Sequence, residues 1–433
     1  MKTFFHKLKF KAKEICYQKL LKFSLWLNWP KASAWLLASF SSVNNRGGKY
    51  TILVIGRTIF YDDIQAMSEF SGRLNYRPIH LVYWEIIFKH LVEPRERVNL
   101  TESNYHSENS NKTGKQKYYH YLRRMFPHLR KFMPFEAVIS GNFGYIVQQE
   151  LARACKDEGI PFLILHKEGI ALVSELESDM KLVSNLRFFG AKALFYNETI
   201  RQLMIGVKSI GLTPENTVVV GSPRLDVYFR KLGQERKNQI VFFAFHPEQR
   251  FAWFDNETDV QSKISLRSEQ FYKFIMDFAL KHKDIKVIIK TKSAKYYSDY
   301  VSGVLKKYFT QDIPNLVITS IGNVKDLISE SKVVIGYNST ALLEALLVGR
   351  LIIMPYFGDL ITKGEWNYFS KYPELINYAK NLADLEEFVF HPDKYLNYDQ
   401  KRKEEYLTQF FPPPFGQASV KAEEEIIKVI ENK

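Results

Sequence analysis

Short runs of β-branched and other apolar residues recur along the chain and alternate with stretches of helical periodicity. A short run that is apolar on both faces is typical of a strand buried in a parallel sheet. The alternation therefore predicts right-handed strand–helix–strand units. The chain has 433 residues, which is too long for one ordinary core, so we expect two domains of this kind.

The first predicted domain spans residues 49–229. Its strands are expected at Thr51–Gly56, Pro78–Trp84, Ala137–Gly141, Pro161–His166, Ala193–Tyr196 and Thr217–Pro223. Residues 95–117 are almost free of apolar side chains and predict a loop. Residues 230–238 are also polar and predict a linker to the second half.

The second predicted domain spans residues 239–415 and repeats the pattern. Its strands are expected at Gln239–His246, Lys286–Lys290, Leu316–Thr319, Val333–Gly336 and Leu351–Pro355. Residues 416–433 predict a C-terminal helix that crosses back. The predicted fold class is α/β, with two Rossmann-like, doubly wound parallel sheets in which ligands lie beyond the carboxyl ends of the strands.

Residues 1–48 form a separate, basic helical segment. Residues 1–50 contain ten Lys or Arg and one acidic residue, Glu14, so they carry most of the net charge of +14. Spacings of three or four place one apolar stripe among the lysines, and the stripe consists of Phe5, Leu8, Ala12, Cys16, Leu20, Phe23 and Leu27.

This basic segment predicts contact with the surface of an anionic membrane. The alternative is a helix packed on the protein's own core, and the chain has no nucleic-acid-binding motif. Lysines interrupt every apolar run, which argues against a secretory signal. Only two cysteines occur, Cys16 and Cys155, in keeping with a reducing compartment. We therefore expect a cytoplasmic protein, peripheral on the inner face of the membrane.

The strongest chemical motif is the strand-to-helix segment around residues 334–359. Tyr337 and Asn338 follow a predicted strand, and Ser339 and Thr340 can cap the next helix. The free N–H groups of such a helix start, with two hydroxyls, suit a phosphate. Glu344 lies one turn further on, near enough to accept hydrogen bonds from ribose hydroxyls. Asp359 follows the next predicted strand, so we expect it at the same edge of the sheet as Ser339. The alternative is an ordinary capped helix.

This segment resembles the nucleotide-binding element of GT-B glycosyltransferases. It is similar to the S-T-x-x-x-E-A-x-x-x-G-x-P pattern in enzymes of surface carbohydrate, capsule and teichoic-acid-type polymer synthesis. The resemblance implies a GT-B-like fold in which Ser339 and Thr340 hold phosphate and Glu344 holds ribose. The chain departs from the pattern at Arg350, where the family usually has Pro.

A second motif, Gly221-Ser-Pro-Arg-Leu-Asp226, resembles the G-x-P-R-x-D segment of surface carbohydrate biosynthesis proteins. Gly221 permits a turn near a ligand, and Ser222 follows it. Arg224 is expected to clamp a phosphate bidentately. The alternative is a linker turn with an Arg–Asp pair.

Three basic residues near strand ends complete the predicted nucleotide-sugar site. His246, within Phe245-His-Pro247, can donate a hydrogen bond to the leaving group. Transferases that use CMP-activated sugars resemble this chain in having a His-Pro pair, though usually after a later strand. Here that later strand ends in Lys290-Thr-Lys292, and either lysine can neutralise phosphate.

A catalytic base for inverting transfer is expected from the first domain. His166-Lys-Glu-Gly169 follows a strand and resembles a His-x-Glu-Gly segment of the same family. Glu168 is the preferred base, with His166 in support, because proton abstraction needs a carboxylate or His close to the acceptor hydroxyl. Asp62 and Asp63 are alternatives.

Gly141 and Asn142 also lie at the carboxyl end of a predicted strand, and we expect them to bind the acceptor. Together these motifs predict a glycosyltransferase that moves a sugar from a CMP- or UDP-activated donor. The acceptor is a cell-surface polysaccharide or a lipid-linked glycan.

No metal site and no cofactor are expected. The chain lacks zinc-ligand spacing, a Walker A loop and the G-x-G-x-x-G fingerprint. Helix dipoles and cations can stabilise the leaving group without a metal. Two alternatives remain open: a transferase of a CDP-glycerol-type polyol phosphate, and a non-catalytic glycan- or nucleotide-binding protein of a capsule assembly complex.

Overall fold

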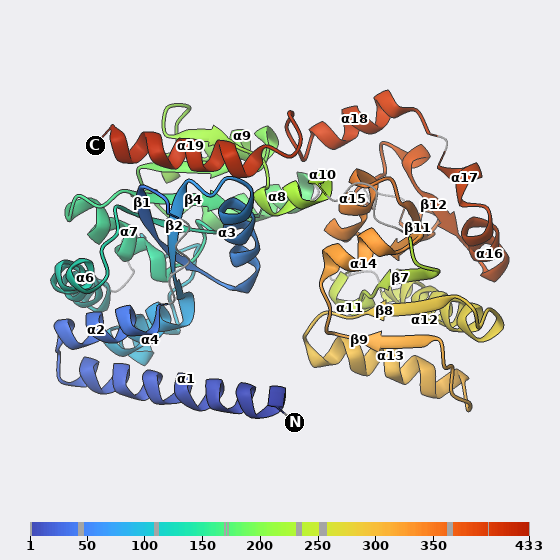
Figure 1. Ribbon diagram of the computed structural model, residues 1–433, viewed down its shortest axis with the longest axis horizontal. Helices are drawn as coiled ribbons and strands as arrows, with labels where there is room; N and C mark the ends of the chain where they lie inside the picture. The colour runs from blue at the N-terminus through green and yellow to red at the C-terminus, as the bar shows by residue number, and fades with distance from the viewer. Residues whose placement is uncertain are drawn as a thin grey trace. The chain divides into compact units, whose positions relative to one another are not determined.

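The computed structural model describes residues 2–41, 47–107, 112–168, 170, 173–230, 236–250, 258–361, 367–396 and 398–432. The chain divides into two compact units (Figure 1). Unit 1 comprises Met1–Asp226 and Gln409–Lys433, and unit 2 comprises Val227–Thr408. Unit 1 thus includes the N-terminal segment 1–48 and the C-terminal helix. Gly169 and most of the predicted linker, residues 231–235, lie outside the described residues.

Unit 1 contains a six-stranded, all-parallel sheet with strand order β2-β1-β3-β4-β5-β6. The strands are β1 (Tyr50–Gly56), β2 (Leu74–His80), β3 (Ala137–Ser140), β4 (Phe162–His166), β5 (Lys192–Phe195) and β6 (Thr217–Val219). The order reverses beside β1, since β2 lies on one side of it and β3 on the other.

Helices cover both faces of this sheet. The helices are α3 (Thr58–Phe70), α4 (Leu81–Leu91), α5 (Pro94–Arg97), α6 (Lys112–Phe132), α7 (Val147–Asp157), α8 (Val173–Val183), α9 (Glu198–Gly206) and α19 (Ala418–Glu431), with short 3₁₀ turns at Lys208–Ile210 and Pro223–Leu225. One buried apolar cluster joins the sheet to α4, α6 and α7, and another joins its opposite face to α3 and α19.

Two local predictions for unit 1 are wrong. The strand expected over Pro78–Trp84 ends at His80, because the His80 side chain accepts a hydrogen bond from the Val82 N–H at 3.1 Å and caps α4. The loop expected over 95–117 is interrupted, since α5 ends within it and α6 begins at Lys112.

Unit 2 contains a second six-stranded, all-parallel sheet, with strand order β12-β11-β10-β7-β8-β9. The strands are β7 (Gln239–Phe243), β8 (Lys286–Lys290), β9 (Leu316–Thr319), β10 (Val333–Gly336), β11 (Leu351–Pro355) and β12 (Asn377–Ala379). Five of these strands were predicted. The sixth, β12, has three residues and no β-branched run.

The helices of unit 2 lie between and around these strands. They are α10 (Asp226–Arg230), which begins at the boundary of the units, α11 (Pro247–Arg250), α12 (Thr258–Lys281), α13 (Lys295–Tyr308), α14 (Val324–Glu330), α15 (Thr340–Leu347), α16 (Leu382–Phe390), α17 (Pro392–Tyr395) and α18 (Gln400–Thr408), with a 3₁₀ turn at Pro373–Leu375. The predicted fold class, two Rossmann-like parallel sheets, is confirmed.

The basic N-terminal segment forms two helices, α1 (Lys2–Trp26) and α2 (Pro30–Phe40). Helix α2 packs on α6, and α1 packs on α2 and α4. Within the described part of the chain, no helix is both long and apolar enough to cross a bilayer.

Helix α19 returns from the end of the chain to unit 1 and is held there by Asp226. The Asp226 carboxylate accepts hydrogen bonds from the N–H groups of Ala418 (3.2 Å) and Ser419 (2.7 Å), the first residues of the helix. Further along, buried Glu423 accepts from the Tyr76 hydroxyl at 2.7 Å and from the Arg73 N–H at 2.8 Å. The Asp of the G-x-P-R-x-D motif is therefore a helix cap.

We expect Asp226→Ala to lower the free energy of unfolding by about 2–3 kcal/mol, because two buried N–H groups lose a charged acceptor. Urea denaturation followed by circular dichroism measures this loss. The control is Glu431→Ala, which removes an exposed carboxylate of the same helix paired with Lys49. A loss at Asp226 no larger than that at Glu431 would contradict the capping role.

Candidate functional site

The sheet of unit 2 reverses its strand order between β7 and β10, and ligands of open parallel sheets bind at such a point. The two strands are in register, with Gly336 opposite Phe243. Three residues beyond this pair, the chain reaches Ser339 on one side and His246 on the other. The structure thus brings two of the predicted nucleotide-sugar residues to the same edge of the sheet.

Helix α15 opens at this edge. Ser339 is its N-cap and accepts a hydrogen bond from the Ala341 N–H at 3.3 Å. Among the described residues, no hydrogen bond engages the N–H groups of Ser339 or Thr340. Both residues are partly exposed. A helix start with donors of this kind favours an anion.

The residue before the cap shapes this turn. Asn338 has a positive φ of 41°, a left-handed conformation that Asn tolerates better than most residues. Its side-chain oxygen accepts from the Tyr368 N–H at 3.1 Å. Tyr337 is buried, with its ring 5.5 Å from that of Phe245 and 5.1 Å from that of Phe357. The buried ring of Tyr337 and the side-chain bond of Asn338 therefore hold the backbone of the turn in place.

Glu344 lies one turn into α15 and is largely buried. The hydroxyl of Tyr228, on α10, donates a short hydrogen bond to its carboxylate. This bond fixes the direction of the carboxylate. A carboxylate has about four acceptor positions, so a bond from Tyr228 is compatible with further bonds to ribose hydroxyls.

His246 lies within a cluster of tyrosines from α13. Its ring centroid is 4.9 Å from that of Tyr300 and 6.2 Å from that of Tyr297. The Nδ1 atom is buried and has no hydrogen-bond partner among the described residues. Lys292 is exposed at the end of β8, with its ammonium 5.3 Å from the centroid of the Tyr297 ring. His246 and Lys292 thus share one aromatic neighbour.

Lys290 has a different environment from Lys292. Its ammonium donates hydrogen bonds to the carbonyls of Thr291 (3.0 Å) and Ser320 (2.9 Å). Burial lowers the pKa of Lys290. The ammonium therefore ties the ends of β8 and β9 together, and Lys292 is the more accessible cation.

Asp359 lines a pocket of about 440 Å³ beyond the carboxyl ends of β11 and β12. Its carboxylate forms an ion pair with Arg267, which also donates to the Tyr356 carbonyl at 3.2 Å. Lys380 also lines the pocket, with its ammonium 4.7 Å from the centroid of the Tyr356 ring. The Arg267 guanidinium holds the pKa of Asp359 below its usual range.

In unit 1, the residues predicted for acceptor and base come together at the ends of β3 and β4. The Asn142 amide donates to the Glu168 carboxylate at 3.5 Å, and the Lys167 N–H donates to the Gly141 carbonyl at 3.1 Å. A Cβ on Gly141 would lie 2.5 Å from the Phe60 ring, so only glycine fits there. This edge adjoins the reversal of strand order beside β1.

Glu168 is the exposed carboxylate of this group, with 51% of its side chain accessible. Partial burial raises its pKa, but the Lys167 ammonium, which donates a short hydrogen bond to it, and the Arg224 charge act in the opposite direction, and the lowering is larger. The pKa of Glu168 is therefore below its ordinary value, and the carboxylate is ionised at neutral pH.

His166 is the last residue of β4 and is buried. Burial lowers the pKa of His166 to about 4, so the imidazole is neutral at pH 7. Its ring packs against Phe195, and Nδ1 has no hydrogen-bond partner among the described residues. His166 therefore has little access to an acceptor in this conformation.

Asp63 is fully buried in α3. It accepts hydrogen bonds from the Tyr196 hydroxyl at 2.6 Å and from the Arg224 N–H at 3.1 Å. Burial raises the pKa of Asp63. Since a group with no exposure cannot reach an acceptor hydroxyl, the contacts of Asp63 are those of a residue that positions the Gly221–Asp226 turn.

Asp63 therefore anchors the second motif. Gly221 has a φ of 90°, and an added Cβ would lie 3.0 Å from Ala418 of α19. Ser222 is buried beside it. The Arg224 guanidinium lies 5.7 Å from the centroid of the Tyr196 ring. Its charge offsets part of the rise in the pKa of Asp63 and contributes to the lowered pKa of Glu168. Arg224 thus links the turn electrostatically to the predicted base.

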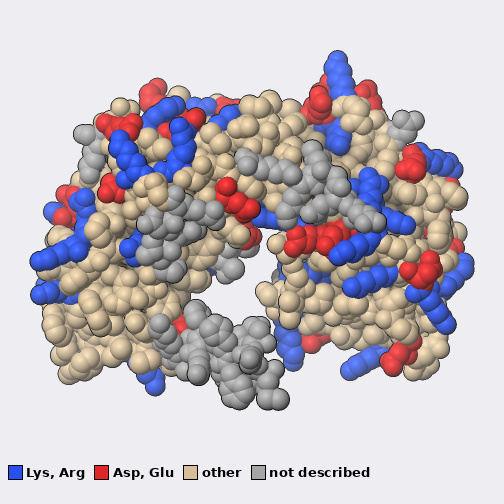
Figure 2. Space-filling view, in the orientation of Figure 1, with Lys and Arg blue, Asp and Glu red and all other residues tan. Residues whose placement is uncertain are grey.

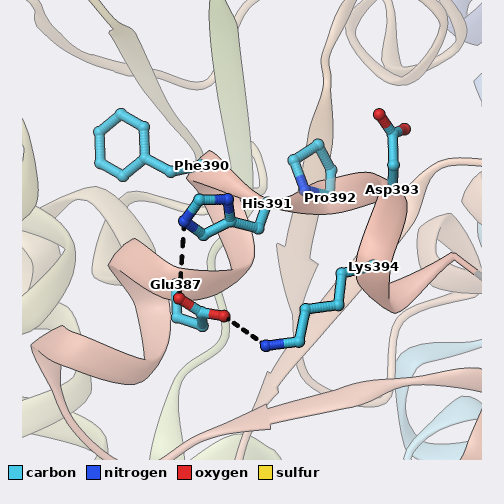
Figure 3. A pocket seen from close by; sticks show the side chains of 6 residues that line it. All are labelled: Glu387, Phe390, His391, Pro392, Asp393 and Lys394. Carbon is cyan, nitrogen blue, oxygen red and sulfur yellow. Dashed lines mark hydrogen bonds and ion pairs between the residues drawn. The ribbon is translucent and has the colours of Figure 1, made fainter.

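A further pocket, of about 380 Å³, lies on α16 and α17 (Figure 3). In this view Glu387 lies between His391 and Lys394 and pairs with both. An adjoining pocket of about 510 Å³ reaches Asn238 and Lys332, at the amino ends of β7 and β10. This edge is opposite the strand ends where parallel sheets bind ligands, so we do not assign the site here.

Sequence reasoning missed three residues of these groups. Tyr228 contacts Glu344 through a side-chain bond between residues far apart in the sequence, which no local motif encodes. Lys167 stands within the His166–Gly169 segment, but only the structure reveals its ion pair with Glu168. Arg350, the departure from the family pattern, is buried and donates to the carbonyls of Ile328 (3.3 Å) and Ser329 (2.6 Å) near the end of α14. A cation stabilises the C-terminal end of a helix, but the sequence alone does not show that Arg350 lies near the end of α14.

No protein-family model and no curated protein match this chain. Solved structures do match it. The wall teichoic acid polymerase TagF, with CDPG, is 12% identical over 98% of both chains, with a TM-score of 0.51. A UDP-N-acetylglucosamine 2-epimerase is 11% identical over 89% of this chain and 97% of its own, also with a TM-score of 0.51. This likeness shows a GT-B-type fold of two Rossmann-like domains.

Proposed function

We propose that the protein is a glycosyltransferase that moves a sugar from a nucleotide-activated donor to a cell-surface polysaccharide or lipid-linked glycan. The observation that carries this proposal is the opening of α15 at the strand-order reversal of unit 2, with the N–H groups of Ser339 and Thr340 at its start. The GT-B-type fold supports it. The structural neighbours named above include enzymes of nucleotide-linked substrates.

In this proposal unit 2 binds the donor. The start of α15 holds the phosphate, and Glu344, oriented by Tyr228, accepts from the ribose hydroxyls. Lys292 and His246 both lie near the Tyr297 ring and supply a cation and a hydrogen-bond donor for the departing phosphate. These groups stabilise negative charge as it develops, which is where electrostatic catalysis is most effective.

Unit 1 binds the acceptor and supplies the base. Glu168 takes the proton of the acceptor hydroxyl while that oxygen attacks the anomeric carbon of the sugar. The bond between the anomeric carbon and the donor phosphate breaks, and its electron pair leaves with the nucleotide. Asn142 orients the Glu168 carboxylate, and ionisation of Glu168 at neutral pH suits it to accept a proton.

A donor panel tests this function. The full chain is incubated with UDP-sugars, CMP-sugars and CDP-glycerol; binding is followed by thermal shift and turnover by release of the free nucleotide. We expect a nucleotide sugar to raise the melting temperature and to be consumed. Turnover of CDP-glycerol alone would favour transfer of a polyol phosphate. Nucleotide binding without turnover would favour a binding protein, and no binding at all would reject the proposal.

A further inference from the structure

The end of α1 and the start of α2 carry an unusual concentration of exposed apolar side chains. Sixteen large hydrophobic residues are exposed among the described residues, and seven of them lie between Ile15 and Trp35. Trp26 is 71% exposed, and Trp29 and Trp35 are each 54% exposed. We call this surface the tryptophan face; it consists of Ile15, Leu20, Phe23, Trp26, Leu27, Trp29 and Trp35.

The opposite side of α1 is firmly packed. Leu21, Ser24 and Leu25 are buried. The Ser24 hydroxyl is 2.7 Å from that of Ser33 on α2, which is 2.6 Å from the Tyr121 hydroxyl on α6. This buried chain of hydroxyls fixes the rotation of α1, so the exposure of the tryptophan face follows from packing within unit 1.

The predicted apolar stripe falls on the exposed side. Cys16, Leu20, Phe23 and Leu27 are all exposed, while the side chains of Phe5, Leu8 and Ala12 lie outside the described residues. The helix therefore packs through other residues than those of the stripe. Contiguous apolar surface of this kind marks a binding site for a membrane or a protein.

The charged residues between Ile15 and Trp35 have one sign, whereas Glu14 directly precedes this span. Lys19, Lys22 and Lys31 are exposed, and none of them takes part in an ion pair with a described residue. No acidic residue occurs from residue 15 to residue 49. In Figure 2 the surface over the end of α1 and over α2, at lower left, is mostly tan, with hardly any red.

We propose that the tryptophan face binds the interface of an anionic lipid bilayer. Tryptophan rings are favoured at the boundary between headgroups and acyl chains, and neighbouring lysines are attracted to anionic headgroups. A second copy of the chain is a poorer partner, because the same lysines would then oppose one another. This partner goes beyond the proposed reaction and does not depend on it.

Vesicle flotation of the full chain tests the proposal. We expect binding to vesicles of equal parts phosphatidylglycerol and phosphatidylcholine, weak binding to phosphatidylcholine alone, and loss of binding in high salt. The variant Trp26→Ala with Trp29→Ala should bind anionic vesicles about tenfold more weakly or worse, since two interfacial anchors are removed. Lys19→Glu with Lys22→Glu should reduce binding to anionic vesicles selectively.

A matched control is Leu182→Ala with Leu266→Ala, which removes two exposed leucines elsewhere and should leave flotation unchanged. Circular dichroism checks that each variant is folded. Absence of flotation, or equal flotation of the tryptophan variant and the wild type, would overturn the proposal. A second outcome would also overturn it: the wild type is a dimer in analytical ultracentrifugation, the tryptophan variant is a monomer, and neither floats with vesicles. Donor binding is measured in parallel without vesicles and should be equal in all variants.

Discussion

Glu168→Gln is expected to lower kcat for glycosyl transfer by roughly 10²- to 10⁴-fold, the usual contribution of a general base. The substitution keeps the size of the side chain and removes only its ability to accept a proton. Donor affinity should be unchanged, because the residues to which the proposal assigns donor binding, at the start of α15 and around Tyr297, belong to unit 2. Turnover of the donor identified by the panel, measured at saturating donor and acceptor, checks the prediction.

The matched control for this variant is Glu198→Gln. Glu198 is also an exposed carboxylate paired with a nearby cation, Arg201, but it lies on α9 rather than beside Asn142. We expect its turnover to equal that of the wild type. If Glu168→Gln retained full activity, Glu168 would not be the base, and the assignment of the acceptor to this edge of unit 1 would lose its chemical support.

The Lys167 ammonium gives a second test of the same residue. It holds the pKa of Glu168 below the ordinary value, and a base works only when deprotonated, so activity should persist as the pH falls through the usual glutamate range. Lys167→Met should raise the pKa of Glu168 and move the acid limb of kcat/KM to higher pH. An unmoved limb would show that another group titrates there.

Glu344→Ala is expected to weaken nucleotide binding by about 1–3 kcal/mol, roughly a 5- to 150-fold rise in Kd. The physical reason is the loss of the acceptor for ribose hydroxyls at the first turn of α15. Isothermal titration calorimetry with the free nucleotide of the preferred donor measures the effect.

Two further variants separate binding from folding at this position, because Glu344 is buried. Glu344→Gln keeps the volume of the side chain and should still lose affinity. Tyr228→Phe removes the tether but keeps the carboxylate, so its affinity should fall less than that of Glu344→Ala. Equal affinity of the wild type and both Glu344 variants, all correctly folded, would reject the ribose role.

Sequence periodicity predicted much of the fold because the signal lies in short, uninterrupted runs. Ile52–Ile55 and Val333–Ile335 are buried on both faces of their sheets, and such runs have few alternatives. The Ser339 cap was likewise predicted from adjacent residues. The failures occurred where this signal is missing or is overridden. At His80, one side-chain hydrogen bond ends the strand within a run of strand-forming residues. Strand β12 has only three residues, which is too short to show a pattern.

The candidate sites were predicted less completely, because they depend on contacts between distant parts of the chain. Tyr228 reaches Glu344 across 116 positions, and Asp226 reaches Ser419 across 193. Asp63 follows a strand like a catalytic residue, yet its side chain points into the core of unit 1. Motifs identify which residues gather at the strand ends, whereas burial and long-range pairing decide which of them are accessible.

The return of α19 to unit 1 has a consequence for the order in which the protein is made. Ala422 and Ile426 complete an apolar cluster whose other members are all translated before residue 221. A nascent chain on the ribosome therefore carries unit 1 with one flank of its sheet uncovered while the whole of unit 2 is synthesised. Only when α19 emerges can the earlier half close, so loss of this helix would damage the part of the protein that was translated first.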